Sequence, residues 1–160
     1  MGRPRAEVIE ALSLEVRRAQ NRSDAYDDAV AEALRVNRTD LRCIDVLSQE
    51  SGSITAGRLA GLMGLSTGAM TTVLDRLERA GYARRVRDEH DRRRVQVELT
   101  RKAHEDVWSF YAPLAALADE LYARYTDEQL ELLLGFLEQG RALAERVDAE
   151  LRERLARAAG

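Results

Sequence analysis

Residues 53–100, SITAGRLAGLMGLSTGAMTTVLDRLERAGYARRVRDEHDRRRVQVELT, decide the fold of this chain. A helix is predicted between Ser66 and Gly81. Ser66 is a favourable N-cap because its hydroxyl can accept a backbone N–H of the first turn. Met70, Val73 and Leu74 follow the three-and-four spacing of one buried face. Gly81 lies where a helix commonly ends in a residue with positive φ. The segment therefore predicts one well-delimited amphipathic helix.

A shorter helix is predicted immediately before it, from Thr55 to about Met63. Thr55 is its N-cap, and Ile54 and Leu59 are spaced as the hydrophobic pair that often brackets a helix start. Gly64 falls in the short connection between the two helices. Two helices joined by a turn of three to four residues, often with glycine, are typical of a helix-turn-helix.

Two short, partly alternating segments follow, at residues 82–86 and 95–99, with a polar turn between them. This pattern predicts a two-stranded wing, and Ile54 could pair with it as a third, very short strand. Six arginines lie between residues 84 and 94. Guanidinium groups on a thin ribbon can enter the narrow minor groove of DNA or bind phosphates in a bidentate way. A solvated charged loop is the plainer interpretation, but it does not account for the neighbouring helices.

The outer face of the 66–81 helix carries short side chains and one arginine. Such a face can approach a DNA groove closely, where threonine methyls contact thymine and arginine can bind guanine. On its own, the same face would also suit an ordinary surface helix. With the wing, we expect DNA binding through Ser66, Thr67, Gly68, Ala69, Thr71, Thr72, Asp75, Arg76, Arg84, Arg85, Asp91, Arg92, Arg93 and Arg94.

Residues 39–102 resemble the core of the MarR (multiple antibiotic resistance regulator) family of dimeric transcription factors. The resemblance rests on Thr39-Asp40-Leu41-Arg42, Gly64-Leu65-Ser66, the run from Leu74 to Gly81, and above all Asp91-Arg92-Arg93 followed by Val95, Val97 and Leu99. It implies that Asp91 braces wing arginines and that Arg93 probes the minor groove. Arg94 follows the motif directly, so which arginine inserts stays open.

The net charge of −3 over 160 residues is unevenly distributed. Residues 55–102 hold 11 basic and six acidic residues, whereas the remainder holds 14 basic and 22 acidic. The local field, rather than the total charge, governs the encounter with phosphates. The charge distribution is therefore compatible with DNA binding.

The flanking segments predict long helices. The first runs from Ala6 to about Val36, and its helical spacing of apolar residues is interrupted around Asn21–Asp24. The second starts at Thr39 as N-cap. After the wing, Thr100 caps a helix in which Pro113 introduces a kink. Thr126 and Gln129 form a capping box for the last helix.

A leucine stripe continues along that last helix to the end of the chain, and nothing further in the sequence could cover it. We therefore expect a homodimer, an arrangement that the family resemblance also implies. The fold class is mainly α, a winged helix-turn-helix with a two- to three-stranded wing sheet. Its expected parts are an N-terminal dimerisation helix (1–38), the DNA-binding domain (39–100) and C-terminal dimerisation helices (101–160).

Other function classes are weakly supported by the sequence. There is no glycine-rich phosphate loop or nucleophile elbow, so we do not expect an enzyme. His90 and His104 lack the neighbours of a metal site, and neither a metal nor a cofactor is expected. No apolar run approaches the roughly 18 residues of a membrane span. A single cysteine and no recognisable signal peptide predict a cytoplasmic protein without membrane contact.

A small aromatic or lipophilic effector is expected from the resemblance, since such regulators bind aromatic acids in a cleft. Candidate residues are Tyr26, Cys43, Trp108 and Tyr111, although core or interface packing is the alternative for each. Cys43 is favoured as a buried small hydrophobe over a redox sensor. We expect a ligand-released repressor of a pseudo-palindromic operator. The open alternatives are an architectural or partner-dependent DNA-binding protein without a ligand, and a cysteine-based redox sensor.

Overall fold

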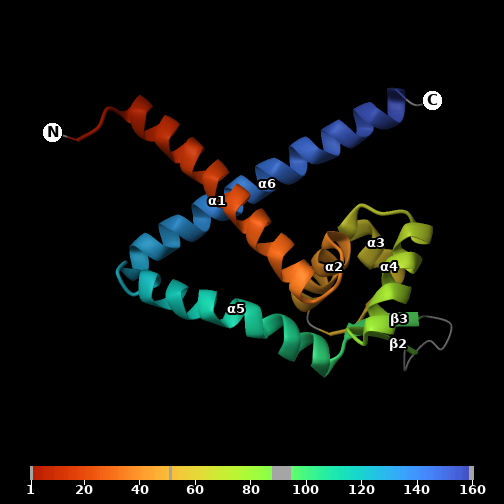
Figure 1. Cartoon of the computed structure of the whole chain (residues 1–160). Helices are drawn as coiled ribbons and strands as arrows, with labels where there is room; N and C mark the ends of the chain where they lie inside the picture. Colours follow the sequence, from red (N-terminus) through yellow and green to blue (C-terminus); the bar gives the residue numbers. More distant parts are fainter. Residues whose placement is uncertain (1, 51, 88–94, 159–160) are drawn as a thin grey trace. The chain divides into compact units, whose positions relative to one another are not determined.

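The computed structural model describes residues 2–50, 52–87 and 95–158. The elements follow one another as α1 (Arg5–Ala33), α2 (Arg38–Ser48), β1 (Ile54–Thr55), α3 (Ala56–Met63), α4 (Thr67–Ala80), β2 (Ala83–Arg87), β3 (Val95–Leu99), α5 (Arg101–Tyr122) and α6 (Asp127–Ala158) (Figure 1). The chain divides into two compact units, Met1–Tyr111 and Ala112–Gly160. The mainly helical winged helix-turn-helix predicted from the sequence is confirmed.

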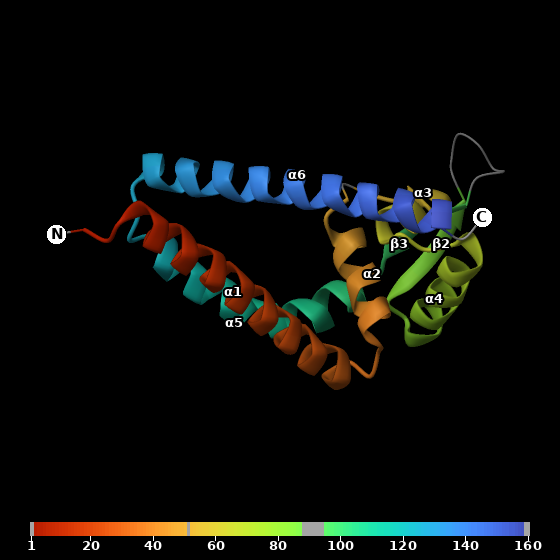
Figure 2. The same cartoon turned by 90° about the horizontal axis from the view of Figure 1, so that it is seen from above.

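The helix-turn-helix forms because local hydrogen bonds fix both helix starts. The Thr55 hydroxyl accepts the backbone N–H of Arg58 at 3.2 Å, and the Ser66 hydroxyl accepts that of Ala69 at 3.3 Å. Gly64 and Gly81 follow the helices with φ of 66° and 77°, a conformation that costs other residues about 1–2 kcal/mol. Figure 2 shows α3 and α4 beside the strands that follow them.

The wing is part of a three-stranded antiparallel sheet with the order β1-β3-β2. Val97 in the central strand is opposite Ile54 on one side and Arg85 on the other. Val97 is fully buried, which anchors the sheet in the core. The prediction that Ile54 supplies a third, very short strand is confirmed.

The core of the Met1–Tyr111 unit consists of two clusters. The larger one packs α2, α3 and α4 against the sheet through Ile44, Leu59, Met70, Leu74 and Leu77, each at most 2% exposed. The smaller one joins the end of α1 to α2 through Val30, Ala31 and Leu41, with Phe110 and Tyr111 packed against it. Burial of this apolar surface, at about 25 cal/mol per Å², is the main term that holds α4 in place.

Two predicted helix boundaries were wrong. The first helix runs unbroken through residues 21–24, where its apolar spacing is interrupted, and it ends at Ala33 instead of Val36. Its polar residues are exposed there, and each costs at most about 0.7 kcal/mol in helix propensity, too little to break a long helix. Arg35, with φ of 55°, lies in the turn that follows. The second helix is capped by Asn37 rather than Thr39, because the Asn37 side chain accepts the Asp40 N–H at 2.9 Å.

The caps of the last two helices are confirmed. The Thr100 hydroxyl accepts the Ala103 N–H at 3.2 Å, and Pro113 lies inside α5. At the start of α6 the Gln129 side chain accepts the Thr126 N–H at 2.9 Å, while the Thr126 hydroxyl accepts the Gln129 N–H at 3.3 Å. No residue of α6 is buried. Among the described helices, none combines the length and apolar character needed to cross a membrane.

Candidate nucleic-acid interface

The outer face of α4 consists of small, exposed residues. Thr67, Gly68, Ala69, Thr71 and Thr72 are all exposed, whereas the opposite face of the helix is buried. The Thr71 and Thr72 hydroxyls donate to the carbonyls of Thr67 and Gly68 at 3.0 and 3.2 Å. A Cβ atom at Gly68 would have no heavy atom within 4 Å, so internal packing does not require glycine there. This face offers a partner a smooth surface with few long side chains.

Arg76 of α4 is held by Asp40 of α2. Its Nε donates to Asp40 Oδ2 at 2.9 Å, and its Nη2 donates to Asp40 Oδ1 at 2.6 Å. The Asp40 side chain is 4% exposed and that of Arg76 is 34% exposed. Hydrogen bonding to the carboxylate raises the pKa of Arg76 above its already high ordinary value. The predicted base-contacting arginine is therefore already engaged within the chain, in a two-pronged arrangement.

The first two wing arginines are also paired within the chain. Arg85 Nη2 donates to Asp75 at 2.7 Å, its Nη1 donates to Glu78, and its backbone N–H donates to Glu78 at 2.9 Å. Arg84 Nε donates to Glu98 on the adjacent strand at 2.5 Å. The hydrogen bonds, with that to Asp75 largest, raise the pKa of Arg85. These contacts join the root of the wing to α4.

The tip of the wing contains the most specific motif of the sequence. Asp91, Arg92, Arg93 and Arg94 lie outside the described residues, as does His90. Arg87, the last described residue before the tip, is exposed. The choice between the tip arginines for the minor groove stays a prediction.

A cavity of about 610 Å³ lies within the first unit, between α1, α2, β3 and the beginning of α5. Its apolar wall includes Leu41, Ile44, Leu99, Val107 and Trp108, and its polar side includes Asp24, Asp27, Arg38, Arg42, Asp45, His104 and Tyr111. A volume of this size is in the range of small-molecule sites in proteins.

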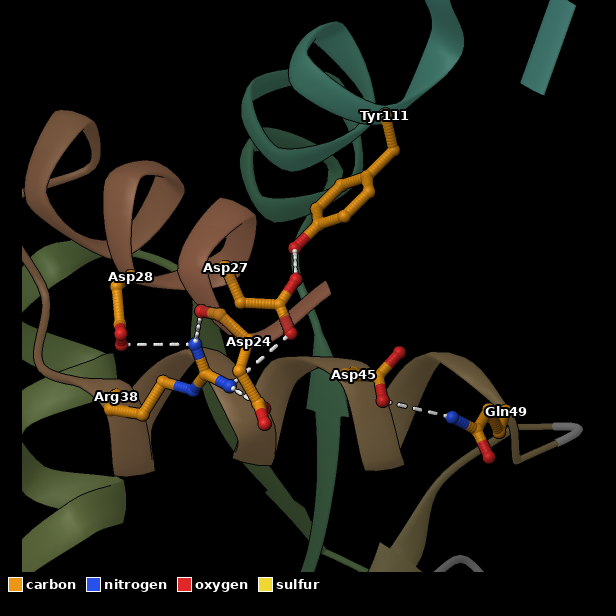
Figure 3. Close-up of polar contacts among 7 residues, drawn as sticks. All are labelled: Asp24, Asp27, Asp28, Arg38, Asp45, Gln49 and Tyr111. Atoms are coloured by element: carbon orange, nitrogen blue, oxygen red, sulfur yellow. Dashed lines mark hydrogen bonds and ion pairs between the residues drawn. The ribbon is translucent and has the colours of Figure 1, made fainter. Parts of the chain in front are cut away.

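The polar side of the cavity is organised by Arg38 and Tyr111 (Figure 3). Arg38 contacts three carboxylates of α1, those of Asp24 at 2.5 Å, Asp28 at 2.9 Å and Asp27 at 3.6 Å. The Tyr111 hydroxyl donates to Asp27 at 2.6 Å. Burial, together with this hydrogen bond, raises the pKa of Tyr111, so the hydroxyl remains a donor. The network ties α2 and α5 to the last turns of α1.

The four residues predicted to bind an effector do not all reach the cavity. Trp108 and Tyr111 line it. Tyr26 stacks edge-on against Tyr111 with ring centroids 5.7 Å apart, and its hydroxyl donates to the Phe110 carbonyl. Cys43 is fully buried in the larger core cluster, and burial raises its pKa to about 12. Cys43 therefore has the surroundings of a packing residue rather than a reactive thiol.

Sequence reasoning missed Asp24, Asp27 and Arg38 as cavity residues. The three-and-four spacing of Asp24, Asp27 and Asp28 indicates one face of a helix, but nothing local indicates that Arg38 binds all three. Within the described residues, no group of three or more histidine, cysteine or acidic side chains is suited to hold a metal ion.

Comparisons with known proteins agree with this geometry. The MarR family model matches residues 36–95. The HTH-type transcriptional regulator YcgE of Bacillus subtilis is 39% identical over 121 residues, which cover 76% of this chain and 78% of that protein. The chain belongs to the MarR family. It is thus a transcriptional regulator with a DNA-binding winged-helix fold, and not an enzyme.

Solved MarR-type structures show the same architecture. The transcriptional regulator PA4135 is 27% identical, with a TM-score of 0.57 over 82% of this chain and 96% of that one. A mutant MepR from a multidrug-resistant S. aureus clinical isolate reaches a TM-score of 0.63 at 17% identity, over 90% of this chain and 99% of that one. A second S. aureus MepR mutant, solved bound to an oligodeoxyribonucleotide, has a TM-score of 0.57 at 19% identity, over 83% and 97%. At 17% and 19% identity, the two MepR structures show that the fold is shared.

Proposed function

We propose that this MarR-family regulator acts in the cytoplasm as a homodimer that binds a pseudo-palindromic operator, represses transcription, and is released by a small aromatic or lipophilic effector. In this proposal α4 enters the major groove, and the wing contacts the minor groove or the phosphates beside it. The single observation that supports DNA binding most is the exposed α4 face, small and polar from Thr67 to Thr72, directly joined to an arginine-rich wing.

The α4 face supports groove entry because packing within the described residues does not explain its composition. Gly68 has open space around it, yet glycine in a helix costs roughly 1 kcal/mol relative to alanine. A close external surface would explain why the smallest residue stands there. Threonine methyls at 71 and 72 suit contact with thymine methyl groups.

The apolar surfaces of the long helices support a homodimer. In α1 the side chains of Val8, Ile9, Leu12 and Val16 are exposed. In α6 a stripe that includes Leu133, Leu137, Val147, Leu151 and Leu155 is exposed. Contiguous apolar stripes of this length are typical of protein interfaces. Two DNA-binding domains related by a two-fold axis would meet half-sites roughly 34–36 Å apart, which is one DNA turn.

The cavity between α1, α2, β3 and α5 supports an effector. It combines an aromatic and aliphatic wall with a few oriented polar groups, as ligand sites do. An effector would lower DNA affinity only through its different affinities for the DNA-bound and free conformations. The burial of Cys43 argues for this mode of regulation over a redox sensor.

DNA binding is tested by fluorescence anisotropy with the fragment upstream of the protein's own gene. Thr72→Asp places a negative charge on the α4 face, and we expect it to weaken binding at least about tenfold by repulsion from phosphate. Asn21→Asp adds the same charge on exposed α1 and should change the dissociation constant less than about twofold. Equal affinity of the wild type for the upstream fragment and for a scrambled duplex would refute the proposal.

The effector is tested with salicylate and related hydroxylated aromatics in a thermal-shift assay, repeated as release from DNA. Trp108→Ala removes an exposed part of the cavity wall and should abolish both responses while leaving DNA affinity intact. An architectural protein without a ligand would bind DNA and show neither response with any compound of the panel. That outcome would favour the alternative function.

A further inference from the structure

Asp40 is unusual among the residues of the chain. Of the residues that the structure describes, it is the one polar or charged residue that is buried, at 3% exposure. Within the described part of the chain its carboxylate accepts side-chain hydrogen bonds only from Arg76, through Nε and Nη2. A buried ion pair repays its desolvation poorly, and an apolar pair of similar size often stabilises a fold equally well. A contribution to stability therefore does not by itself explain why Asp40 and Arg76 form a buried ion pair.

The ion pair between Asp40 and Arg76 orients the Arg76 guanidinium. Two parallel hydrogen bonds from a planar guanidinium to one carboxylate fix the plane of the guanidinium as well as its position. Asp40 is itself fixed, because its backbone N–H donates to Asn37 Oδ1 at 2.9 Å in the first turn of α2. Two residues earlier, Arg38 ties the same turn to the carboxylates of α1 (Figure 3). Arg76 is thus attached to a rigid support.

The position of Arg76 on α4 connects this support to the exposed face. Residues at i, i+3 and i+7 lie on one side of a helix, so Arg76 continues the line of Ala69 and Thr72. Ala69 and Thr72 are exposed, and a third of the Arg76 side chain is exposed as well. Among residues 2–50, 52–87 and 95–158, no partner of Arg76 Nη1 is present. One edge of the guanidinium remains available to an outside acceptor.

From these observations we infer that Asp40 is a positioning residue for DNA binding, which holds Arg76 so that its Nη1 edge donates to the DNA. Asp40 does not touch DNA in this arrangement. Arginine held in place before binding loses less rotamer entropy when it binds phosphate or a base edge. The inference rests on the proposed use of α4 as the helix that enters the groove.

The inference is tested by a double-variant cycle measured as affinity for the upstream DNA fragment. Asp40→Asn keeps the shape of the side chain and removes the charge, and Arg76→Gln removes the guanidinium. We expect Asp40→Asn to weaken binding about tenfold in the wild-type background and less than about twofold in the Arg76→Gln background. If Arg76 contacts phosphate, Arg76→Gln also lowers the salt dependence of log K by about one unit.

A role confined to holding α2 against α4 predicts a different pattern. Asp40→Asn would then lower the melting temperature and leave the DNA affinity of the folded protein and its salt dependence unchanged. That result, or an equal loss of affinity in both backgrounds, overturns the inference. The matched control is Asp119→Asn, the same change at an exposed carboxylate of α5, which should bind like wild type.

Folding of each variant is verified by circular dichroism at the temperature of the binding assay. If Arg76→Gln does not fold because it leaves Asp40 buried without a partner, the cycle is completed with Arg76→Lys. Lysine keeps the charge but cannot form the two-pronged contact, so we expect it to bind DNA as weakly as Asp40→Asn, and wild-type affinity would overturn the inference. Failure of the wild type to bind any duplex refutes the proposed function, whereas wild-type binding with no effect of Asp40→Asn refutes only this inference.

Discussion

The buried thiol of Cys43 makes the stability of the protein depend on pH. Burial gives this thiol a higher pKa in the native state than in the unfolded chain. Burial raises the pKa from an ordinary 9.0 to about 12 in the native state. Between these values the unfolded thiol loses its proton and the native thiol keeps it, so stability falls as pH rises. From about pH 7.5 to 10.5 this difference lowers the free energy of unfolding by about 2 kcal/mol.

The measurement compares wild type with Cys43→Ala by urea unfolding at both pH values. At neutral pH the variant should be less stable by about 1 kcal/mol, because it loses a small buried side chain. At about pH 10.5 the order should reverse, since the variant has no thiol to ionise when it unfolds. All other titrating groups are common to both proteins and cancel in the difference. A difference between the two proteins that is independent of pH, or rapid reaction of the native thiol with DTNB, would refute the reasoning.

Five further substitutions test three local features of the fold by thermal or urea unfolding. Ser66→Ala removes the cap of α4 and should cost about 1 kcal/mol; no loss would mean that the cap is unimportant. Gly81→Ala should destabilise the fold by about 1–2 kcal/mol because φ is 77° at this position. Gly57→Ala, in open space within α3, should stabilise the fold by about 0.5–1 kcal/mol. Effects of the same sign would contradict the backbone argument. Tyr111→Phe removes the hydrogen bond to Asp27 and should cost about 1–2 kcal/mol. The control Tyr122→Phe, at an exposed tyrosine, should change the stability by less than about 0.5 kcal/mol.

The helix-turn-helix could be predicted closely because its signals are local. The caps at Thr55 and Ser66 and the glycines at the helix ends act on backbone groups within a few residues of themselves. The sequence also predicted that Ile54 could pair with the wing as a third, very short strand, and it pairs with β3. The start of α2 was misplaced by two residues because Asn37 and Thr39 are both good caps, and in the structure it is Asn37 that accepts the N–H of the residue three positions on, Asp40.

The partners of the charged residues could not be predicted, because they come from distant parts of the chain. Asp40 and Arg76 are 36 residues apart, and Tyr111 and Asp27 are 84 residues apart. Counting charges indicated a basic wing but not that Arg84 and Arg85 are compensated by Glu98, Asp75 and Glu78. The sequence pattern therefore predicts a DNA-binding face, while only the fold shows which of its arginines are paired with carboxylates of the same chain.

The central claim is that α4 and the wing bind operator DNA twice per dimer, and hydroxyl-radical footprinting of the protein on its own upstream region tests it most directly. We predict two protected half-sites on one face of the duplex, with centres roughly 34–36 Å apart, and additional minor-groove protection beside each. Protection that is absent, or no stronger than that on a scrambled fragment at the same salt concentration, would contradict the account.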